Sequence, residues 1–199
     1  IPGDAANIAE SLPFLNAGQQ SDVGFAERRF SLDNGYGVLF TNGTGTGKTY
    51  TGLGIARRFE RQGKGNILIA APTQKVIEDW VRSGKNLGLD IKALDSTSDN
   101  GKSGIVITTY ANLGANDTLG RRDWDLVITD EAHYLMQEKD GNPTGYLHNL
   151  RAISMHPRGR WKLAEMRYHK EFAAFQTAME AMDQAEKAKR IADFAGYTI

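Results

Sequence analysis

The stretch from residue 41 to residue 51 constrains the fold of this chain more than any other part of the sequence. It reads Thr-Asn-Gly-Thr-Gly-Thr-Gly-Lys-Thr-Tyr-Thr, with an apolar run at 38–40 before it and apolar residues at helical spacing over 48–61 after it. This order predicts a strand, a glycine-rich turn and a helix, which is the layout of a phosphate-binding loop. Glycines permit the tight turns that let successive N–H groups converge on an anion at the positive end of a helix.

The loop supplies candidates for binding a nucleoside triphosphate. Lys48 would place a positive charge beside the β- and γ-phosphates, and the hydroxyl of Thr49 would bind Mg²⁺. Asn42 stands where the usual pattern has glycine, whereas 43–49 is intact. A flexible glycine turn with a solvated lysine is the alternative, and the flanking strand and helix patterns favour the phosphate loop over it. The candidate nucleotide contacts in the loop are Asn42, Gly43, Thr44, Gly45, Thr46, Gly47, Lys48 and Thr49.

Strand and helix patterns alternate from residue 38 to residue 135. Continuous apolar runs without polar alternation are typical of strands covered on both faces, as in a parallel sheet. We therefore predict an α/β fold with a mostly parallel sheet and helices on both faces, whose ligands bind at the carboxyl ends of the strands. Besides the loop region, the expected helices are 19–30 and 74–86, and the expected strands are 67–71, 89–94, 105–110 and 124–129.

The last of these strands ends in a second candidate site, Asp130-Glu131-Ala132-His133. Asp130 would hold Mg²⁺, and Glu131 would polarise the attacking water as general base. Two adjacent carboxylates are costly to bury without a cation, so a strand end that is open to solvent and metal suits them. An Asp-Glu pair also occurs by chance in acidic turns, and it is the combination with a phosphate loop that favours the catalytic interpretation.

Composition excludes several classes of protein. The 199 residues suffice for one α/β domain, and 24 basic against 24 acidic residues leave no net charge, so nucleic-acid binding would need a local patch. The absence of cysteine excludes disulfides and thiolate metal sites. No apolar run approaches the ~20 residues that cross a bilayer, and no signal peptide is recognisable, so we expect no membrane partner and a cytoplasmic location. The sequence starts without methionine, and we expect a fragment or a processed chain.

The end of the sequence differs from the rest, and we divide the chain into a domain at 1–150 and an arm at 151–199. Residues 161–195 predict one long helix with a heptad-like apolar seam, which would pack on the core of this chain, on another helix or on a partner. The stretch 151–170 has an excess of basic residues with interleaved aromatics, which suits a nucleic-acid strand as well as it suits a solvated face. The nucleic-acid candidates there are Arg158, Arg160 and Lys162.

Several of these stretches together resemble the motifs of superfamily 2 helicases and translocases. The stretches similar to motifs I, Ia, Ib and II are 43–49, 71–73, 108–110 and 130–133, in the order and spacing of that family. Gln19, with Val23 four places later, resembles the glutamine motif of the same family. The sequence is also similar to helicase-like proteins encoded by bacteriophages. The resemblance covers residues 19–135.

This resemblance implies a RecA-like domain that uses ATP and Mg²⁺. It implies that Gln19 reads adenine and that His133 couples the nucleotide site to the next motif. It also implies that Thr73, Thr108 and Thr109 lie near a nucleic-acid backbone, with DNA as the expected partner, and such contacts carry no base-sequence information.

The resemblance also indicates what this chain needs from outside. The family has a second RecA-like domain with an arginine finger, and no Ser-Ala-Thr motif follows the acidic residues within 136–199. An arginine finger is worth ~10³–10⁵ in rate. We therefore expect the chain alone to bind ATP weakly and to hydrolyse it slowly.

We predict the motor domain of a superfamily 2 DNA helicase or translocase, an ATP hydrolase that couples Mg-ATP hydrolysis to movement on nucleic acid in a bacterial or phage-infected cell. Three alternatives stay open. The first is the motor of a restriction-modification system, which shares these motifs and translocates without separating strands. The second is a non-catalytic nucleotide-binding module in which the helix at 161–195 recruits a partner. The third, a P-loop phosphotransferase, has less support because no acceptor site or lid is recognisable.

Overall fold

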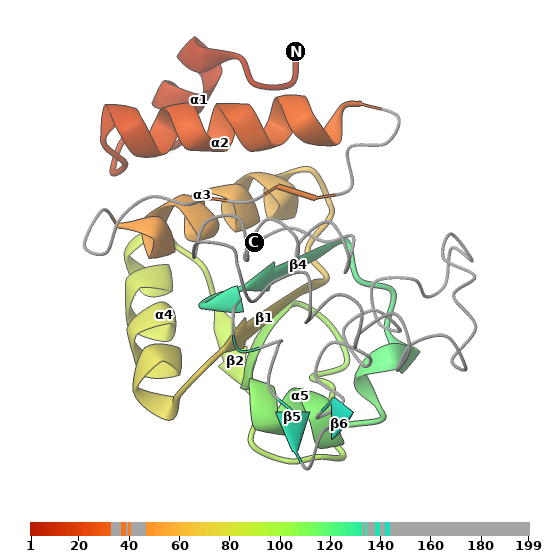
Figure 1. Ribbon diagram of the computed structural model, residues 1–199. Helices are drawn as coiled ribbons and strands as arrows, with labels where there is room; N and C mark the ends of the chain where they lie inside the picture. The colour runs from red at the N-terminus through yellow and green to blue at the C-terminus, as the bar shows by residue number, and fades with distance from the viewer. Residues whose placement is uncertain are drawn as a thin grey trace.

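The computed structural model describes residues 1–32, 37–38, 40, 47–132, 134, 138–139 and 142–143. Its centre is a sheet of four parallel strands, β1 (Ile67–Ala71), β2 (Ile91–Ala93), β3 (Ile105–Thr109) and β4 (Leu126–Thr129). The strands lie in the order β2-β3-β1-β4, with β4 beside β1 as Figure 1 shows, and Ile67 pairs with Ile105 on one side and with Leu126 on the other. A short antiparallel pair, β5 (Glu138–Lys139) and β6 (Asn142–Pro143), follows β4 in the sequence. The predicted α/β fold with a parallel sheet is confirmed.

Helices alternate with these strands along the chain. They are α1 (Ala5–Ser11), α2 (Ala17–Phe30), α3 (Lys48–Arg61), α4 (Gln74–Asn86) and α5 (Tyr110–Ala115), with a 3₁₀ turn, η1 (Leu119–Arg121). The bounds predicted for α3 and α4 are confirmed, because apolar residues at helical spacing mark one face of each helix clearly. The helix predicted at 19–30 begins earlier, at Ala17, after the N-cap Asn16.

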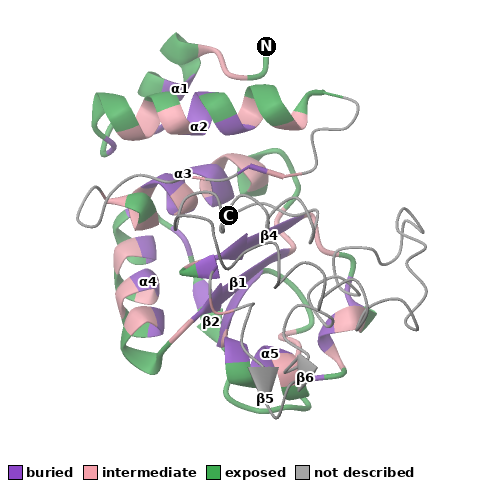
Figure 2. Cartoon of the chain, in the orientation of Figure 1, coloured by how far each residue is buried: buried purple, intermediate pink, exposed green. Residues whose placement is uncertain are grey.

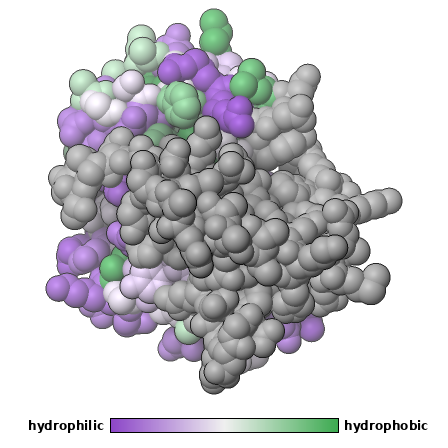
Figure 3. Space-filling view, in the orientation of Figure 1, coloured by the Kyte–Doolittle hydropathy of each residue, from purple (hydrophilic) through white to green (hydrophobic). Residues whose placement is uncertain are grey.

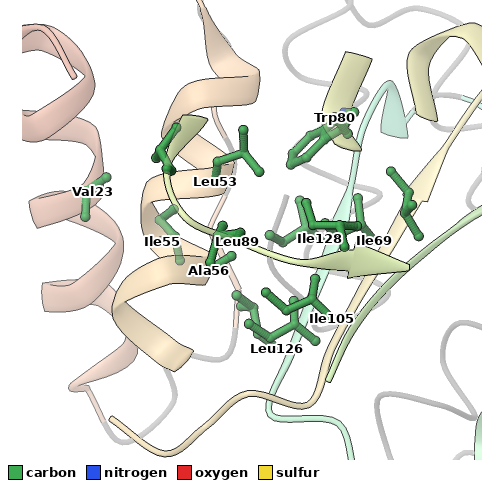
Figure 4. Packing of buried hydrophobic residues seen from close by; sticks show 14 of the residues in the cluster. Val23, Leu53, Ile55, Ala56, Ile69, Trp80, Leu89, Ile105, Leu126 and Ile128 are labelled. Atoms are coloured by element: carbon green, nitrogen blue, oxygen red, sulfur yellow. The ribbon is translucent and has the colours of Figure 1, made fainter. Parts of the chain in front are cut away.

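The strand side chains alternate between two buried faces of the sheet. One set joins the main core together with residues from α3 and α4, as Figure 4 shows for Leu53, Ile69, Trp80 and Ile128. The alternate set, which includes Leu68, Val106 and Val127, is also buried (Figure 2). Because both faces are covered, the strands need apolar residues at consecutive positions, which is why they lack polar alternation.

The N-terminal helices form a further layer on α3 (Figure 1). Gly54 allows this approach, since a Cβ there would lie 3.1 Å from a methyl carbon of Leu12. A largely buried ion pair joins Glu27 on α2 to Arg58 on α3, and the same carboxylate accepts the backbone N–H of Gly3 at 2.9 Å. The ion pair joins the C-terminal parts of α2 and α3, and the hydrogen bond from the Gln19 side chain to the Gly47 carbonyl joins their starts.

The surface of this N-terminal layer is mixed. The well-exposed large apolar side chains of the described residues all belong to it, namely Ile1, Phe14, Phe25 and Leu32. In the space-filling view, apolar and hydrophilic residues alternate over the region of α1 and α2 (Figure 3). Among the described helices, none combines the length and the apolar composition that a membrane span needs.

One predicted element differs in the structure, and others lie outside the described residues. The two described positions of the strand expected at 38–40 are not part of a strand. Val38 is buried and Phe40 packs against the core. Leu39 and the whole of 151–199, including the expected helix at 161–195, lie outside the described residues, so the division into 1–150 and 151–199 stays a prediction.

Candidate functional site

The first half of the candidate site is the start of α3, which begins directly after Gly47. Gly47 has φ 76° and ψ 35°, the left-handed conformation that glycine adopts without strain. A Cβ at this position would collide with the side-chain nitrogen of Gln19. The left-handed backbone conformation therefore favours glycine here, and an added Cβ would also force the end of the Gln19 side chain to move.

The same helix end has no side-chain cap from its N-cap residue, Gly47. The helices α1, α2, α4 and α5 each begin with a side chain that accepts a backbone N–H of the first turn, from Asp4, Asn16, Thr73 and Thr109 respectively. Within the described part of the chain, α3 is the one α-helix that begins without such a cap. First-turn N–H groups have no partner inside a helix, so an uncapped start presents donors and partial positive charge to an anion.

Lys48 and Thr49 lie in this first turn. Lys48 is exposed and Thr49 is half-buried. Lys48 is close enough to Asp130 for its charge to favour the ionised carboxylate, so the start of α3 and the end of β4 belong to one site. The other loop candidates, Asn42, Gly43, Thr44, Gly45 and Thr46, lie outside the described residues.

The second half of the site is Asp130, which three other elements hold in place. Its backbone N–H donates to the carbonyl of Ala70 in β1 at 2.8 Å, which extends the pairing of β4 by one residue. Its backbone carbonyl accepts the hydroxyl of Tyr110 at 2.7 Å. Its carboxylate Oδ2 accepts the indole N–H of Trp80 on α4 at 2.9 Å. The orientation of Asp130 is therefore determined by β1, α4 and α5 together.

The electrostatics of Asp130 are those of a partly buried carboxyl group. Burial raises the pKa of Asp130 above its ordinary value, and the charge of Glu131 acts in the same direction. The Trp80 N–H, the Lys48 charge and the Glu131 backbone N–H oppose this effect without cancelling it. A divalent cation beside the group would favour its ionised form, because nearby positive charge stabilises a carboxylate.

Glu131 has an unusual backbone and an exposed side chain. Its φ of 54° is a left-handed conformation that non-glycine residues rarely adopt. Such strain costs on the order of 1–3 kcal/mol and is common at functional sites. Tyr134 stabilises the turn, since its N–H donates to the Glu131 carbonyl at 3.0 Å and its ring stacks on Tyr110 with centroids 5.8 Å apart. His133 lies outside the described residues.

Two of the threonines predicted to lie near nucleic acid occupy equivalent places. Thr73 caps α4 by accepting the N–H of Val76 at 3.3 Å, and Thr109 caps α5 by accepting the N–H of Asn112 at 3.1 Å. Ala71 pairs with Thr109 in neighbouring strands, so the two caps lie at the same carboxyl edge of the sheet. A cap uses only the oxygen of a hydroxyl group, which leaves the O–H as a donor.

Thr108 corrects the prediction that placed it with them. It is fully buried, and its hydroxyl donates to the carbonyl of Leu94 at 3.1 Å and accepts from the side-chain amide of Asn112 at 2.6 Å. The reason is the alternation of side chains in a strand, which points Thr108 and Thr109 to opposite faces. Thr108 has no surface for nucleic acid. The basic candidates Arg158, Arg160 and Lys162 lie outside the described residues.

Gln19 lies against Gly47, the residue directly before α3. Its side-chain nitrogen donates to the carbonyl of Gly47 at 3.2 Å. Its side-chain oxygen accepts the N–H of Asn16 at 2.9 Å, which completes a capping box at the start of α2. A primary amide has two N–H groups and two oxygen lone pairs, so these bonds leave capacity for a further donor-acceptor pair with a ligand.

The donors at this site fit Mg²⁺ with a nucleotide phosphate. Thr49 and Asp130 offer oxygen atoms, and Mg²⁺ usually takes one or two protein oxygens besides phosphates and water. The described residues contain no group of three or more acidic, histidine or cysteine side chains that could hold a metal ion alone. A cation here would therefore share phosphate oxygens as ligands, and the uncapped start of α3 is the place that would hold those phosphates.

The contacts of three supporting residues could not be predicted from the sequence. Helical spacing predicts that Trp80 faces the core, but it does not identify Asp130 as the partner of the indole N–H. The hydroxyl of Tyr110 is a similar case, because a buried aromatic with a polar atom needs a partner that the sequence does not name. Gly52 is the third, since a Cβ there would lie 2.7 Å from the Trp80 ring.

Comparison with known proteins identifies a family. Residues 14–188 match the protein family described as Type III restriction enzyme, res subunit. The matched range includes the whole of α3 and the acidic residues after β4. No curated protein matches the chain.

Proposed function

Because the chain belongs to the Type III restriction enzyme, res subunit family, we propose that it is the ATP-binding part of a motor that couples Mg-ATP hydrolysis to movement along DNA. The family has a superfamily 2 helicase-type, RecA-like ATP-binding domain, and the parallel sheet of this chain is consistent with it. The observation that carries the proposal is the uncapped start of α3 beside the carboxylate of Asp130.

The residues divide the work of hydrolysis as follows. The first-turn N–H groups of α3 and the ammonium of Lys48 would bind the phosphates, while Thr49 and Asp130 would hold the cation. Bound Mg²⁺ supplies neutralisation of phosphate charge and a template for in-line attack. Glu131, exposed after β4, orients the attacking water and takes its proton. His133 couples this site to the next motif.

Gln19 reads the base in this proposal. Its amide nitrogen already contacts the carbonyl of Gly47, so the side chain lies between the start of α2 and the phosphate-binding loop. The remaining donor and acceptor of the amide match the paired donor and acceptor on the Hoogsteen edge of adenine, which favours ATP over GTP.

The nucleic acid passes the carboxyl edge of the sheet on the side of Thr73 and Thr109. Both residues use the hydroxyl oxygen as a helix cap, which leaves each O–H group to donate to a phosphate oxygen of the backbone. The family name favours DNA as the partner, because restriction enzymes act on DNA. Such contacts to the backbone make the motor tolerant of base sequence.

In this proposal full turnover also uses an arginine finger from a second RecA-like domain, as the resemblance to superfamily 2 implies. We therefore expect slow hydrolysis by this chain alone. The family favours a restriction-type translocase over a strand-separating helicase. Strand-displacement and translocation assays on the full-length protein distinguish these two motors, and a non-catalytic module would show neither activity.

Calorimetry with ATP, with and without Mg²⁺, tests the proposal directly. Lys48→Ala removes a cation that contacts phosphate, which we expect to cost about 2 kcal/mol or more, or roughly thirtyfold in affinity. Lys75→Ala is the matched control, because Lys75 is exposed in the first turn of the capped helix α4. No binding of Mg-ATP by the wild-type chain, or equal binding by the Lys48 variant, contradicts the proposed function.

A further inference from the structure

Trp80 makes a contact that core packing does not require. Its residue is only 2 % exposed, and it lies in the main core on the same side of the sheet as Leu53 and Ile128 (Figure 4). Its indole N–H nevertheless has a polar partner, because it donates to Oδ2 of Asp130, directly after β4, at 2.9 Å. Burying an apolar ring in this core does not by itself require an N–H group with a polar partner.

The same indole also touches the helix that carries the phosphate-binding residues. A Cβ on Gly52 would lie 2.7 Å from Cη2 of Trp80 and 3.8 Å from a methyl carbon of Ile128. Gly52 follows Thr49 by less than one helical turn. The ring therefore lies between the first turns of α3 and the end of β4, the two parts that the proposed site must hold at a fixed separation.

A carboxylate at the end of a strand can rotate about its side-chain bonds unless a second group holds it. The backbone of Asp130 is held by Ala70 and Tyr110, but neither bond restrains its side chain. Among the described residues, the indole N–H of Trp80 and the backbone N–H of Glu131 are the hydrogen-bond donors that act on the carboxylate itself. Partners of this kind orient metal-binding carboxylates, and their loss typically weakens metal binding or activity by about 10–100-fold.

Building on the proposed function, we propose that Trp80 is a positioning residue that orients the Asp130 carboxylate for Mg²⁺. The indole N–H donates to Oδ2 and so limits rotation of the carboxylate. Gly52 has no side chain, which leaves room for the ring to reach Asp130. Trp80 touches neither nucleotide nor water in this role. Trp80 also connects two regions of the proposed site. Its helix, α4, begins after Thr73 at the edge where nucleic acid is expected, and its indole reaches the metal-binding end of β4.

The test measures nucleotide affinity as a function of Mg²⁺ concentration, using ATP and calorimetry on the intact chain. Trp80→Phe keeps an aromatic ring and removes the N–H. We expect the Mg²⁺ concentration at half-effect to rise about tenfold, while the affinity for ATP without Mg²⁺ stays the same. A residue that only fills the core would not change the metal dependence separately from metal-free binding.

Trp124→Phe is the matched control. The indole N–H of Trp124 also donates one hydrogen bond, to the carbonyl of Leu119 at 2.8 Å, but that bond lies away from β4's carboxyl end. This variant should show the wild-type Mg²⁺ dependence. Thermal unfolding of all variants establishes that each is folded at the temperature of the measurement.

Two further variants keep the test decisive where Trp80→Phe unfolds. Replacing Trp80 by its benzothiophene analogue, in which sulfur takes the place of N–H, retains the shape of the ring and should give the same tenfold change. Gly52→Ala should push the ring away from Asp130 and act in the same direction, whereas Gly54→Ala, on the side of α3 that faces Leu12, should leave the Mg²⁺ dependence unchanged.

The outcomes separate this proposal from the function on which it rests. A wild-type chain that binds no Mg-ATP overturns the proposed function and the role of Trp80 with it. A wild-type chain that binds Mg-ATP, together with Trp80 variants of unchanged Mg²⁺ dependence, overturns the role of Trp80 alone. A rise in the Mg²⁺ concentration at half-effect in the Trp80 and Gly52 variants, with an unchanged metal-free affinity for ATP, supports both.

Discussion

Two neighbouring helices of this molecule, α3 and α4, begin in opposite ways. α4 begins after Thr73, whose hydroxyl oxygen accepts the first-turn N–H of Val76. α3 begins after Gly47, which has no side chain to offer and a left-handed backbone. A capped start satisfies its own donors, whereas an uncapped start leaves them for a ligand. The difference identifies which of the two helix starts is arranged for an anion, although both carry threonine and lysine nearby.

Of the variants that test the difference between the two helix starts, Gly47→Ala should have the largest effect on stability and on ATP binding. The left-handed backbone would cost about 1–3 kcal/mol in the variant, and the new methyl group would displace the side chain of Gln19. In a chain of this size each kcal/mol lowers Tm by about 2–4 °C. We expect a lower Tm in thermal unfolding and no measurable ATP binding by calorimetry.

Gly63→Ala separates backbone strain from the site. Gly63 follows the other end of α3 with φ 75°, and a Cβ there would meet nothing within 4 Å. This variant should lose similar stability and keep the affinity of the wild type for ATP. Equal loss of ATP binding in both variants would show that the uncapped start of α3 is not responsible.

Asp130→Asn should have an effect of intermediate size. It should raise the stability of the ligand-free chain and remove the gain in ATP affinity that Mg²⁺ brings. Because burial raises the pKa of Asp130, ionising this group in the folded chain costs stability as the pH rises through the range between its ordinary pKa and the raised one. The asparagine variant avoids that cost. Without ligand it should therefore melt higher than the wild type at neutral pH and equally at acidic pH below the ordinary aspartate value of about 3.9.

The dependence of ATP affinity on Mg²⁺ is the second measurement on the Asp130→Asn variant. Asp130→Asn should bind ATP without Mg²⁺ as the wild type does and should lose the gain in affinity that Mg²⁺ brings. Thermal unfolding over a pH series and calorimetry with Mg-ATP measure the two effects. Asp123→Asn, at an exposed position, is the control and should change neither. A lower Tm for Asp130→Asn at neutral pH would contradict the assigned sign.

Thr73→Ala should have the smallest effect on nucleotide binding. Loss of the N-cap costs about 1 kcal/mol, or a fall of about 2–4 °C in Tm for a chain of this length. ATP affinity should stay at the wild-type value, and Thr73→Ser should restore stability because serine also caps helices well. A loss of ATP affinity comparable to that of Gly47→Ala would remove the distinction between the two helix starts.

Much of the fold could be predicted because its signals are local. The apolar run at 67–71 and the helical periodicity of α3 and α4 repeat over many residues, and the structure has these elements with the expected bounds. The predicted strand at 89–94 is shorter in the structure, Ile91–Ala93, because only part of that alternating pattern pairs with β3. Strand ends depend on a neighbour that the local sequence does not contain.

The surroundings of the candidate site were harder to predict. Trp80 and Tyr110 are 50 and 20 positions from Asp130 in the sequence, and no periodicity relates them. Thr108 and Thr109 look equivalent in the sequence, yet only Thr109 has a side of the sheet from which it can reach a ligand. These relations depend on which strands pair and on which face each helix covers.

The sequence by itself determined the class of fold and the main chemical groups of the site. Glycine in the Gly-Lys-Thr stretch and carboxylates after an apolar strand are chemical requirements that can be recognised one residue at a time. Only the tertiary structure decided that Trp80 holds Asp130, that Gln19 reaches Gly47 and that α3 starts uncapped. The physical reason is that hydrogen bonds act over about 3 Å, so their partners are set by packing and not by distance along the chain.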